Sequence, residues 1–223
     1  LTINQPTAAV TNALAINAGT CVVSGNLIFA GTSNTTTRVG RVAVTSGSFT
    51  LNGSITWMSN TAVATEVITT ATGTLNFANS VSLVAGTGTI TVTGAGNINF
   101  DGTTAPCLSF GGGAGTAPVF TSAYGSNVNF NKGLTATTTN LTFAVGSSQT
   151  FKGTATVTPS STVTFGNFQI NPGYTITVAG NIAVKGNWNN QGTFVPGTYT
   201  VTFNGTGTQT ISHTGGETFY KLA

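Results

Sequence analysis

The chain is a succession of short segments in which apolar and polar residues alternate, each bounded by glycine, asparagine, serine or proline. In one of them, Phe49 and Leu51 alternate with small polar residues before Gly53 closes the segment. Alternation with a period of two between turn-forming residues predicts a β-strand with one apolar face. The phrase occurs at Ala18 to Gly25, Ser46 to Gly53, Thr72 to Asn79, Thr87 to Gly94, Gly94 to Gly102, Tyr124 to Gly133, Pro159 to Gly166, Pro172 to Gly180 and Pro196 to Gly205.

The recurrence of one phrase predicts a stack of similar units. The copies lie about 8, 13 to 15 and 21 to 29 residues apart, which fits rungs, and parts of rungs, of unequal length. In a solenoid each rung buries its apolar side chains against its neighbours, and stacked Asn and Thr side chains can bond to one another between rungs. We therefore expect an all-β chain folded as a β-solenoid, like a parallel β-helix, with irregular rungs. One or two β-sandwich domains are the alternative.

The repeat pattern is interrupted in the glycine-rich stretch from Gly102 to Phe120. Such a stretch fits a loop that projects from the solenoid, or a boundary between two modules. The sequence favours a single elongated β-rich module over residues 1–223. The interruption also allows a subdivision into 1–101 and 121–223.

The composition excludes several classes of protein. Charged residues make up 4% of the chain and the net charge is +3, whereas an ordinary domain is about 25% charged. The scarcity of good helix formers argues against a helical bundle, and 39% hydrophobic residues argue against disorder driven by charge. Lys and Arg do not form the cluster that nucleic acid requires. No apolar stretch is long enough for a transmembrane helix.

Side chains that carry out catalysis are few and dispersed. The carboxylates are Glu66, Asp101 and Glu217, and His213 is the single histidine. Cleavage of polysaccharides needs carboxylates that act as a pair, and a zinc site needs several nitrogen or sulfur ligands. We therefore expect no catalytic residue, no metal site and no cofactor. Asp101 and Glu217 are interpreted as turn residues, and His213 as an exposed turn histidine.

Two pairs of residues leave alternatives open. Cys21 and Cys107 can form a disulfide in an oxidising compartment, or can act as small buried apolar residues. Trp57 and Trp188 can present their rings to a glycan, or can pack in the core or at a corner. Surface glycans are therefore a candidate partner, and a carbohydrate-binding or carbohydrate-active β-helix module is the alternative function.

The last quarter of the chain carries three linked phrases. They consist of Gly186, Asn187, Trp188, Asn190, Gly192 and Phe194, then Gly197, Thr198, Thr200 to Gly205 and Gln209 to Ile211, then Thr218, Phe219, Tyr220 and Leu222. This segment resembles the repeat regions of large bacterial extracellular adhesin-like surface proteins. The resemblance implies a secreted β-helical stalk or adhesive module without catalytic residues. We expect an extracellular or cell-surface location, reached after removal of a signal peptide.

Both termini have the pattern of a strand. Because the strands at the ends of a solenoid need partners, we expect the termini of two subunits to pair by β-strand addition and to build a head-to-tail filament. The candidate contact residues are Leu1, Thr2, Ile3, Asn4, Phe219, Tyr220 and Leu222. The same ends also fit one module of a longer protein, in which the pairing is intramolecular. The expected function is that of a non-enzymatic extracellular structural or adhesive protein.

Overall fold

The fold is described from a computed structural model, which describes residues 1–5, 11–31, 39–58, 66–84, 88–112 and 117–223. The side chains of residues 11–13, 39, 66 and 67 lie outside this description. The described residues form 28 β-strands and no α-helix, and none of them belongs to a helix that could cross a membrane.

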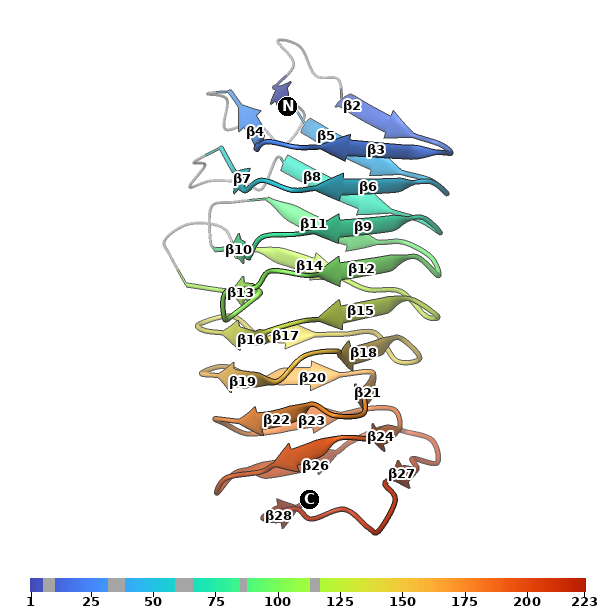
Figure 1. Cartoon of the computed structure of the whole chain (residues 1–223), viewed down its shortest axis with the longest axis vertical. Helices are drawn as coiled ribbons and strands as arrows, with labels where there is room; N and C mark the ends of the chain where they lie inside the picture. Colours follow the sequence, from blue (N-terminus) through green and yellow to red (C-terminus); the bar gives the residue numbers. More distant parts are fainter. Residues whose placement is uncertain (6–10, 32–38, 59–65, 85–87, 113–116) are drawn as a thin grey trace.

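The strands follow one another around three sides of an elongated coil (Figure 1). The first side is a single sheet of nine strands, which spans the length of the coil. Its strands are β3 (Thr20–Val23), β6 (Ser48–Leu51), β9 (Thr74–Phe77), β12 (Asn97–Phe100), β15 (Asn127–Phe130), β18 (Ser148–Phe151), β21 (Asn167–Ile170), β24 (Trp188–Asn190) and β27 (Ile211–Ser212).

Each of the other two sides is divided into two sheets along the axis. The second side contains β1 (Thr2–Asn4), β4 (Leu27–Ala30) and β7 (Ile55–Thr56), then β10 (Val81–Leu83), β13 (Leu108–Phe110), β16 (Gly133–Ala136), β19 (Ala155–Pro159), β22 (Thr175–Val178) and β25 (Thr193–Val195). The third side contains β2 (Thr11–Ile16), β5 (Val39–Val44), β8 (Glu66–Thr70), β11 (Thr89–Val92) and β14 (Val119–Thr121), then β17 (Leu141–Thr142), β20 (Val163–Phe165), β23 (Ile182–Val184), β26 (Thr200–Phe203) and β28 (Lys221–Leu222).

Every strand pair recorded among the described residues is parallel, and partners lie about one turn apart in the sequence. Ile98 pairs with Leu75 on one neighbour and with Val128 on the other. The predicted β-solenoid is therefore confirmed. The β-sandwich alternative is wrong, because the sheets of a sandwich are built from antiparallel strands.

The apolar residues of the repeated phrase point into the coil. Strands of the first side alternate between half-buried and buried positions, as β12 does. The rings of Phe77, Phe100, Phe130 and Phe151 stack along the axis with centroid separations of 5.6, 5.6 and 5.2 Å. Burial of these large apolar side chains is the main favourable contribution to the stability of the coil.

The irregular spacing of the phrase has two causes. Copies of the phrase form strands on all three sides, since Ser46 to Gly53 contains β6, Pro172 to Gly180 contains β22 and Pro196 to Gly205 contains β26. The length of a turn also varies. The bonded pair Asn99 and Asn76 lies 23 residues apart, whereas Asn129 and Asn99 lie 30 residues apart.

The glycine-rich stretch from 102 to 120 does not interrupt the first side. Strand β12 before it pairs directly with β15 after it, and the stretch itself contributes β13 to the second side. Residues 113–116 lie outside the described part. The sheet therefore continues across the point at which the sequence allowed a division into two modules.

Candidate functional site at the ends of the solenoid

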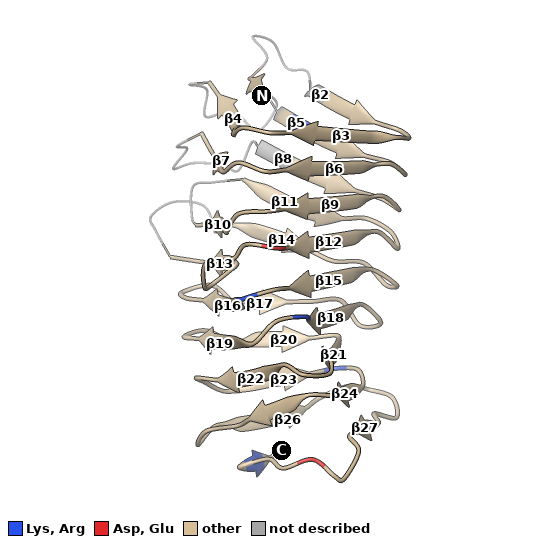
Figure 2. Cartoon of the chain, in the orientation of Figure 1, with Lys and Arg blue, Asp and Glu red and all other residues tan. Residues whose placement is uncertain are grey.

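The carboxylates of Asp101 and Glu217 are held apart by the fold. Asp101 follows β12 and forms an ion pair with Lys152, with 2.7 Å between Oδ1 and Nζ. Glu217 follows β27, five strands further along the first side, which is about 24 Å at the usual spacing of strands. The side chain of Glu66 lies outside the described part of the chain. The few charged residues are spread along the coil (Figure 2).

Glu217 is a structural residue rather than a simple turn residue. Its side chain is 5% exposed, and its Oε2 accepts hydrogen bonds from Trp188 Nε1 at 2.7 Å and Asn190 Nδ2 at 2.8 Å. His213 is half-buried, not exposed as expected, and its Nδ1 lies 3.8 Å from Glu217 Oε1. Among the described residues, His213 Nδ1 is buried without a hydrogen-bond partner. The bonds of Glu217 to Trp188 and Asn190 stabilise the last turn of the coil.

The two tryptophans do not offer open ring faces. Trp188 is fully buried and stacks on Phe168 with a centroid separation of 4.2 Å. Trp57 is half-buried, stacks on Phe29, and donates a hydrogen bond to the carbonyl oxygen of Ser82 at 2.9 Å. The Trp188 ring is therefore a core residue that cannot stack on a glycan, and Trp57 has the packing role that was its alternative.

The Cys21–Cys107 disulfide is also wrong, because both cysteines are free. Cys21 lies on β3, and Cys107 follows β12, three strands further along the first side. That separation is about 14 Å along the axis, whereas a disulfide needs Cα atoms within about 7 Å. Cys107 is buried, its Sγ donates to the carbonyl oxygen of Gly133 at 3.1 Å, and burial raises the pKa of its thiol.

The N-terminal end of the coil presents the edges of three strands. The outermost strands there are β1, β2 and β3. Four half-buried apolar side chains pack against the core at this end, namely Ile3, Leu14, Cys21 and Val23. Phe49 and Leu51, which occupy the same positions as Cys21 and Val23 one turn further along, are 0% and 1% exposed. Of the predicted contacts, Leu1, Thr2 and Asn4 are exposed, and Ile3 belongs to the apolar end of the core.

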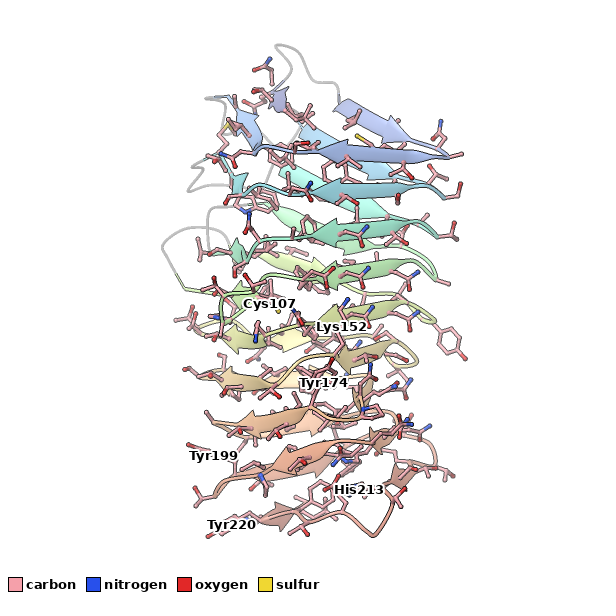
Figure 3. All side chains as sticks on the ribbon, viewed as in Figure 1. Cys107, Lys152, Tyr174, Tyr199, His213 and Tyr220 are labelled. Atoms are coloured by element: carbon pink, nitrogen blue, oxygen red, sulfur yellow. The ribbon has the colours of Figure 1, made fainter. Side chains whose placement is uncertain are left out.

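The C-terminal end presents the edges of β27 and β28, and the chain between these two strands passes across the end of the coil (Figure 1). Phe219 is directed inward and contacts Trp188, with 5.3 Å between ring centroids. It is therefore a core residue and not a free contact, contrary to the prediction. Tyr220 and Leu222 are exposed, and Figure 3 shows Tyr220 and His213 at this end.

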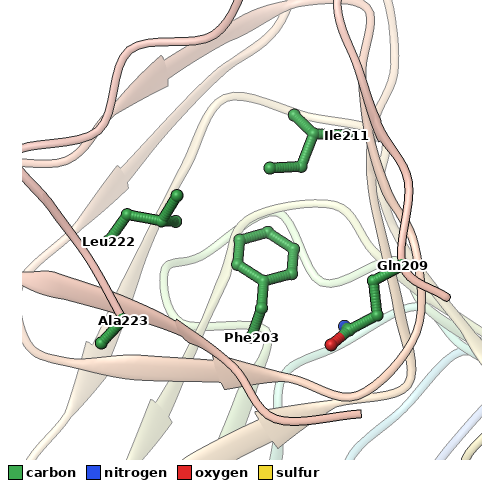
Figure 4. A pocket seen from close by; sticks show the side chains of 5 residues that line it. All are labelled: Phe203, Gln209, Ile211, Leu222 and Ala223. Atoms are coloured by element: carbon green, nitrogen blue, oxygen red, sulfur yellow. The ribbon is translucent and has the colours of Figure 1, made fainter. Parts of the chain in front are cut away.

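Beside β28 lies an apolar hollow of about 350 Å³, which we call the end hollow (Figure 4). It is lined by Phe203, Gln209, Ile211, Leu222 and Ala223. Gln209 fixes its rim, because its Nε2 donates to the carbonyl oxygens of Gly186 and Val184 at 2.7 and 3.0 Å. Phe203, Gln209 and Ile211 were not predicted as contact residues from the sequence. All three lie within the second phrase of the C-terminal segment, and this shared position was the sequence signal for them.

Among the described residues, no three His, Cys, Asp or Glu side chains lie close enough together to hold a metal ion. Comparisons with protein-family models, with curated proteins and with solved structures found no match. The two ends of the coil, with their strand edges and apolar side chains, are therefore the candidate functional site.

Proposed function

We propose that this chain is a non-enzymatic structural module that associates end to end with a second copy of itself and builds an extracellular stalk or filament. The observation that carries the proposal is the presence of strand edges and incompletely buried core side chains at both ends. Edges of this kind are sites for the addition of further strands.

The geometry of the two ends supports a coaxial arrangement. All recorded strand pairs are parallel, so a second copy stacked in the same orientation continues the parallel pairing. In that arrangement β2 of one copy faces β28 of the other, because both strands lie on the third side. A contact between two different surfaces of the same chain does not close by symmetry, and it therefore produces an open filament.

Apolar burial supplies the driving force. Leu222 is 53% exposed and Ile211 is 42% exposed at the end hollow, and Ile3 and Val23 are half-buried at the opposite end. Fully burying one such side chain contributes about 1.5 to 3 kcal/mol. The strands that pair between the two copies add backbone hydrogen bonds. The resulting contact excludes water and needs no charged groups.

The extracellular location and the absence of catalysis are parts of the same proposal. The resemblance of the C-terminal segment to repeats of bacterial surface proteins supports the location. The dispersed carboxylates support a structural role, since Asp101 is paired with Lys152 and Glu217 is bonded to Trp188 and Asn190.

Replacing Leu222 by aspartate tests the contact. A carboxylate at the end hollow must lose its water when the second copy docks, which is costly for an unpaired charge. We expect the mass of the wild-type chain in sedimentation velocity to rise with concentration. In Leu222→Asp the dissociation constant should rise by at least about a hundredfold, which is about 3 kcal/mol.

Val119→Asp is the matched control, because Val119 is a similarly exposed apolar strand residue in the middle of the coil. This variant should assemble as the wild-type chain does, and circular dichroism should give the same β signature for all three proteins. A wild-type chain that stays monomeric at every concentration would overturn the proposal. So would a Leu222→Asp variant that assembles as well as the wild type.

A further inference from the structure

The outer face of the nine-stranded side has a uniform chemistry. Each strand turns alternate side chains outward, and the pairing register aligns these side chains in two columns along the axis. The first column is Thr20, Ser48, Thr74, Asn97, Asn127, Ser148 and Asn167, and the second is Val22, Thr50, Asn76, Asn99, Asn129, Thr150, Gln169, Asn189 and Ser212. Every member except Val22, which lies on the outermost strand β3, carries an amide or a hydroxyl group, and we call this surface the amide–hydroxyl face.

The amides in the middle of this face are held in place by bonds to one another. Asn99 Nδ2 donates to Asn76 Oδ1 at 2.7 Å, and Asn129 Nδ2 donates to Asn99 Oδ1 at 2.8 Å. In the other column, Asn127 Nδ2 donates to Asn97 Oδ1 at 3.0 Å. Each such bond uses one of the two N–H groups of an amide. The second N–H therefore remains for a ligand, at a repeat of about 4.8 Å along the axis.

Because these side chains are already ordered, less conformational entropy is lost when a ligand binds to them. Flexible surface side chains lose conformational entropy when they are fixed in an interface. The asparagines in the middle of the amide–hydroxyl face are already fixed by the ladder, so they need little further ordering on binding.

The amide–hydroxyl face carries almost no net charge. No member of either column is charged, and the neighbouring Lys152 and Asp101 neutralise each other in their ion pair at 2.7 Å. Such a surface offers nothing that attracts a polyanion. It is complementary to a neutral ligand that is rich in hydroxyl groups and repeats on the scale of the rungs.

Two further features of the amide–hydroxyl face suit a neutral ligand that is rich in hydroxyl groups. A hollow of about 400 Å³ lies at its C-terminal end, which we call the polar hollow. It is lined by Asn187, Trp188, Asn189, Gln191, Thr210 and Ser212, and Asn187 Oδ1 accepts a bond from the backbone N–H of Thr210 at 2.9 Å. Its size lies within the range of small-molecule and oligosaccharide sites.

The second feature is an exposed aromatic ring beside the face. Tyr124 precedes β15, is 80% exposed, and lies directly against Gly146 of the next turn, where no side chain could be accommodated. A tyrosine ring presents an apolar surface with a polar tip, which suits stacking on the C–H face of a sugar.

We propose that the amide–hydroxyl face binds a neutral polysaccharide, whose chain lies along the solenoid axis with its sugar hydroxyls on the amide columns. The eight steps between the nine strands give a binding track of about 38 Å. The polar hollow holds one part of the polysaccharide, and Tyr124 stacks on a sugar ring. Most of this site is on the side of the coil, and it adjoins the contact between the ends at β27, where Ser212 lines the polar hollow and Ile211 lines the end hollow.

The experiment measures retention of the full chain by insoluble cellulose, chitin and granular starch, with soluble polygalacturonate as an anionic comparison. The wild-type chain should bind at least one neutral polysaccharide and should not bind polygalacturonate. Asn189→Ala combined with Gln191→Ala removes two amides from the polar hollow, and Tyr124→Ala removes the ring. Each variant should weaken binding about tenfold, as expected for the loss of roughly 1.4 kcal/mol.

The controls are Asn204→Ala and Tyr220→Ala, which remove an exposed amide and an exposed ring away from the amide–hydroxyl face. Both should bind the polysaccharide as the wild type does, and all variants should melt at the same temperature. Retention by none of the neutral polysaccharides would overturn the assignment. Equal binding by the polar-hollow and Tyr124 variants, or binding to polygalacturonate alone, would also overturn it.

Discussion

At the scale of single residues, Gln149 is a polar side chain inside the otherwise apolar stack of the first side. Gln149 occupies an inward position between Val128 and Phe168 on the first side. It is fully buried, its Oε1 accepts from the N–H of Gly166 at 2.7 Å, and its Nε2 donates to Ser147 Oγ at 2.8 Å. The alternating pattern could not assign these bonds, because Gly166 is on the next turn of the coil.

Glu217 illustrates the same limit. Its position in a glycine-rich turn predicts an exposed carboxylate, but the turn folds back over the last rung and places it beside Trp188 and Asn190. Asparagine columns, by contrast, were predictable. Residues of one type recur on one face of similar phrases, and parallel stacking without offset brings them together.

The two cysteines should differ strongly in reactivity. The reactive species of a cysteine is the thiolate, and burial raises the pKa of the Cys107 thiol, whereas Cys21 is half-buried. Alkylation of the folded chain near pH 8 should modify Cys21 rapidly and Cys107 only as the chain unfolds. Two rapidly modified thiols would contradict the burial of Cys107, and an absence of free thiols would restore the disulfide.

The same shift has a consequence for stability. Because the pKa of Cys107 is higher in the folded chain than its ordinary value of 9.0, the unfolded chain loses this proton first as the pH rises. The contribution of the neutral thiol is therefore complete below pH 9.0 and is lost progressively above it. Urea midpoints of the wild-type chain should fall over that range, and Cys107→Ala should remove this part of the decrease.

At the scale of elements, the strands and the β-solenoid were predicted because the signal is local and repeated. Period-two alternation between turn residues specifies each strand, and the recurrence specifies the stack. The side to which each strand belongs was not predictable. Nearly identical phrases form β6, β22 and β26 on three different sides, because the preceding corner, and not the strand itself, determines the direction of the chain.

The corners before the first side depend on a column of stacked glycines. A Cβ atom on Gly73 would lie 2.5 Å from the carbonyl oxygen of Gly47 on the preceding turn, and also close to Val44. We expect Gly73→Ala to lower the free energy of unfolding by about 1 to 3 kcal/mol, as overpacking of a filled interior does. Urea unfolding followed by circular dichroism measures this change.

Gly207→Ala is the matched control, because nothing lies within 4 Å of a Cβ atom at that position. This variant should remain within about 0.5 kcal/mol of the wild type. If both variants unfold at the same urea concentration as the wild type, the glycine column does not limit how closely the turns approach.

At the scale of the whole molecule, the coil combines an almost uncharged surface with two ends that are less well buried than its middle. Charged residues are 4% of the chain, so the proposed association should depend on strand pairing and apolar contact rather than on ion pairs. The termini were predicted to be contact regions from their strand-like sequence, and this stays a prediction. The end hollow was not predicted, because it is formed by Phe203, Ile211 and Leu222 from three different strands.

Electron microscopy of the concentrated wild-type chain at low salt and in about 0.5 M salt, where the Debye length is roughly 4 to 5 Å, tests the central claim most directly. Stacking through the ends predicts unbranched filaments one solenoid wide, with strands perpendicular to the filament axis and equal abundance in both salt conditions. Single particles at every concentration, filaments joined side to side, or filaments that dissolve in salt would contradict it.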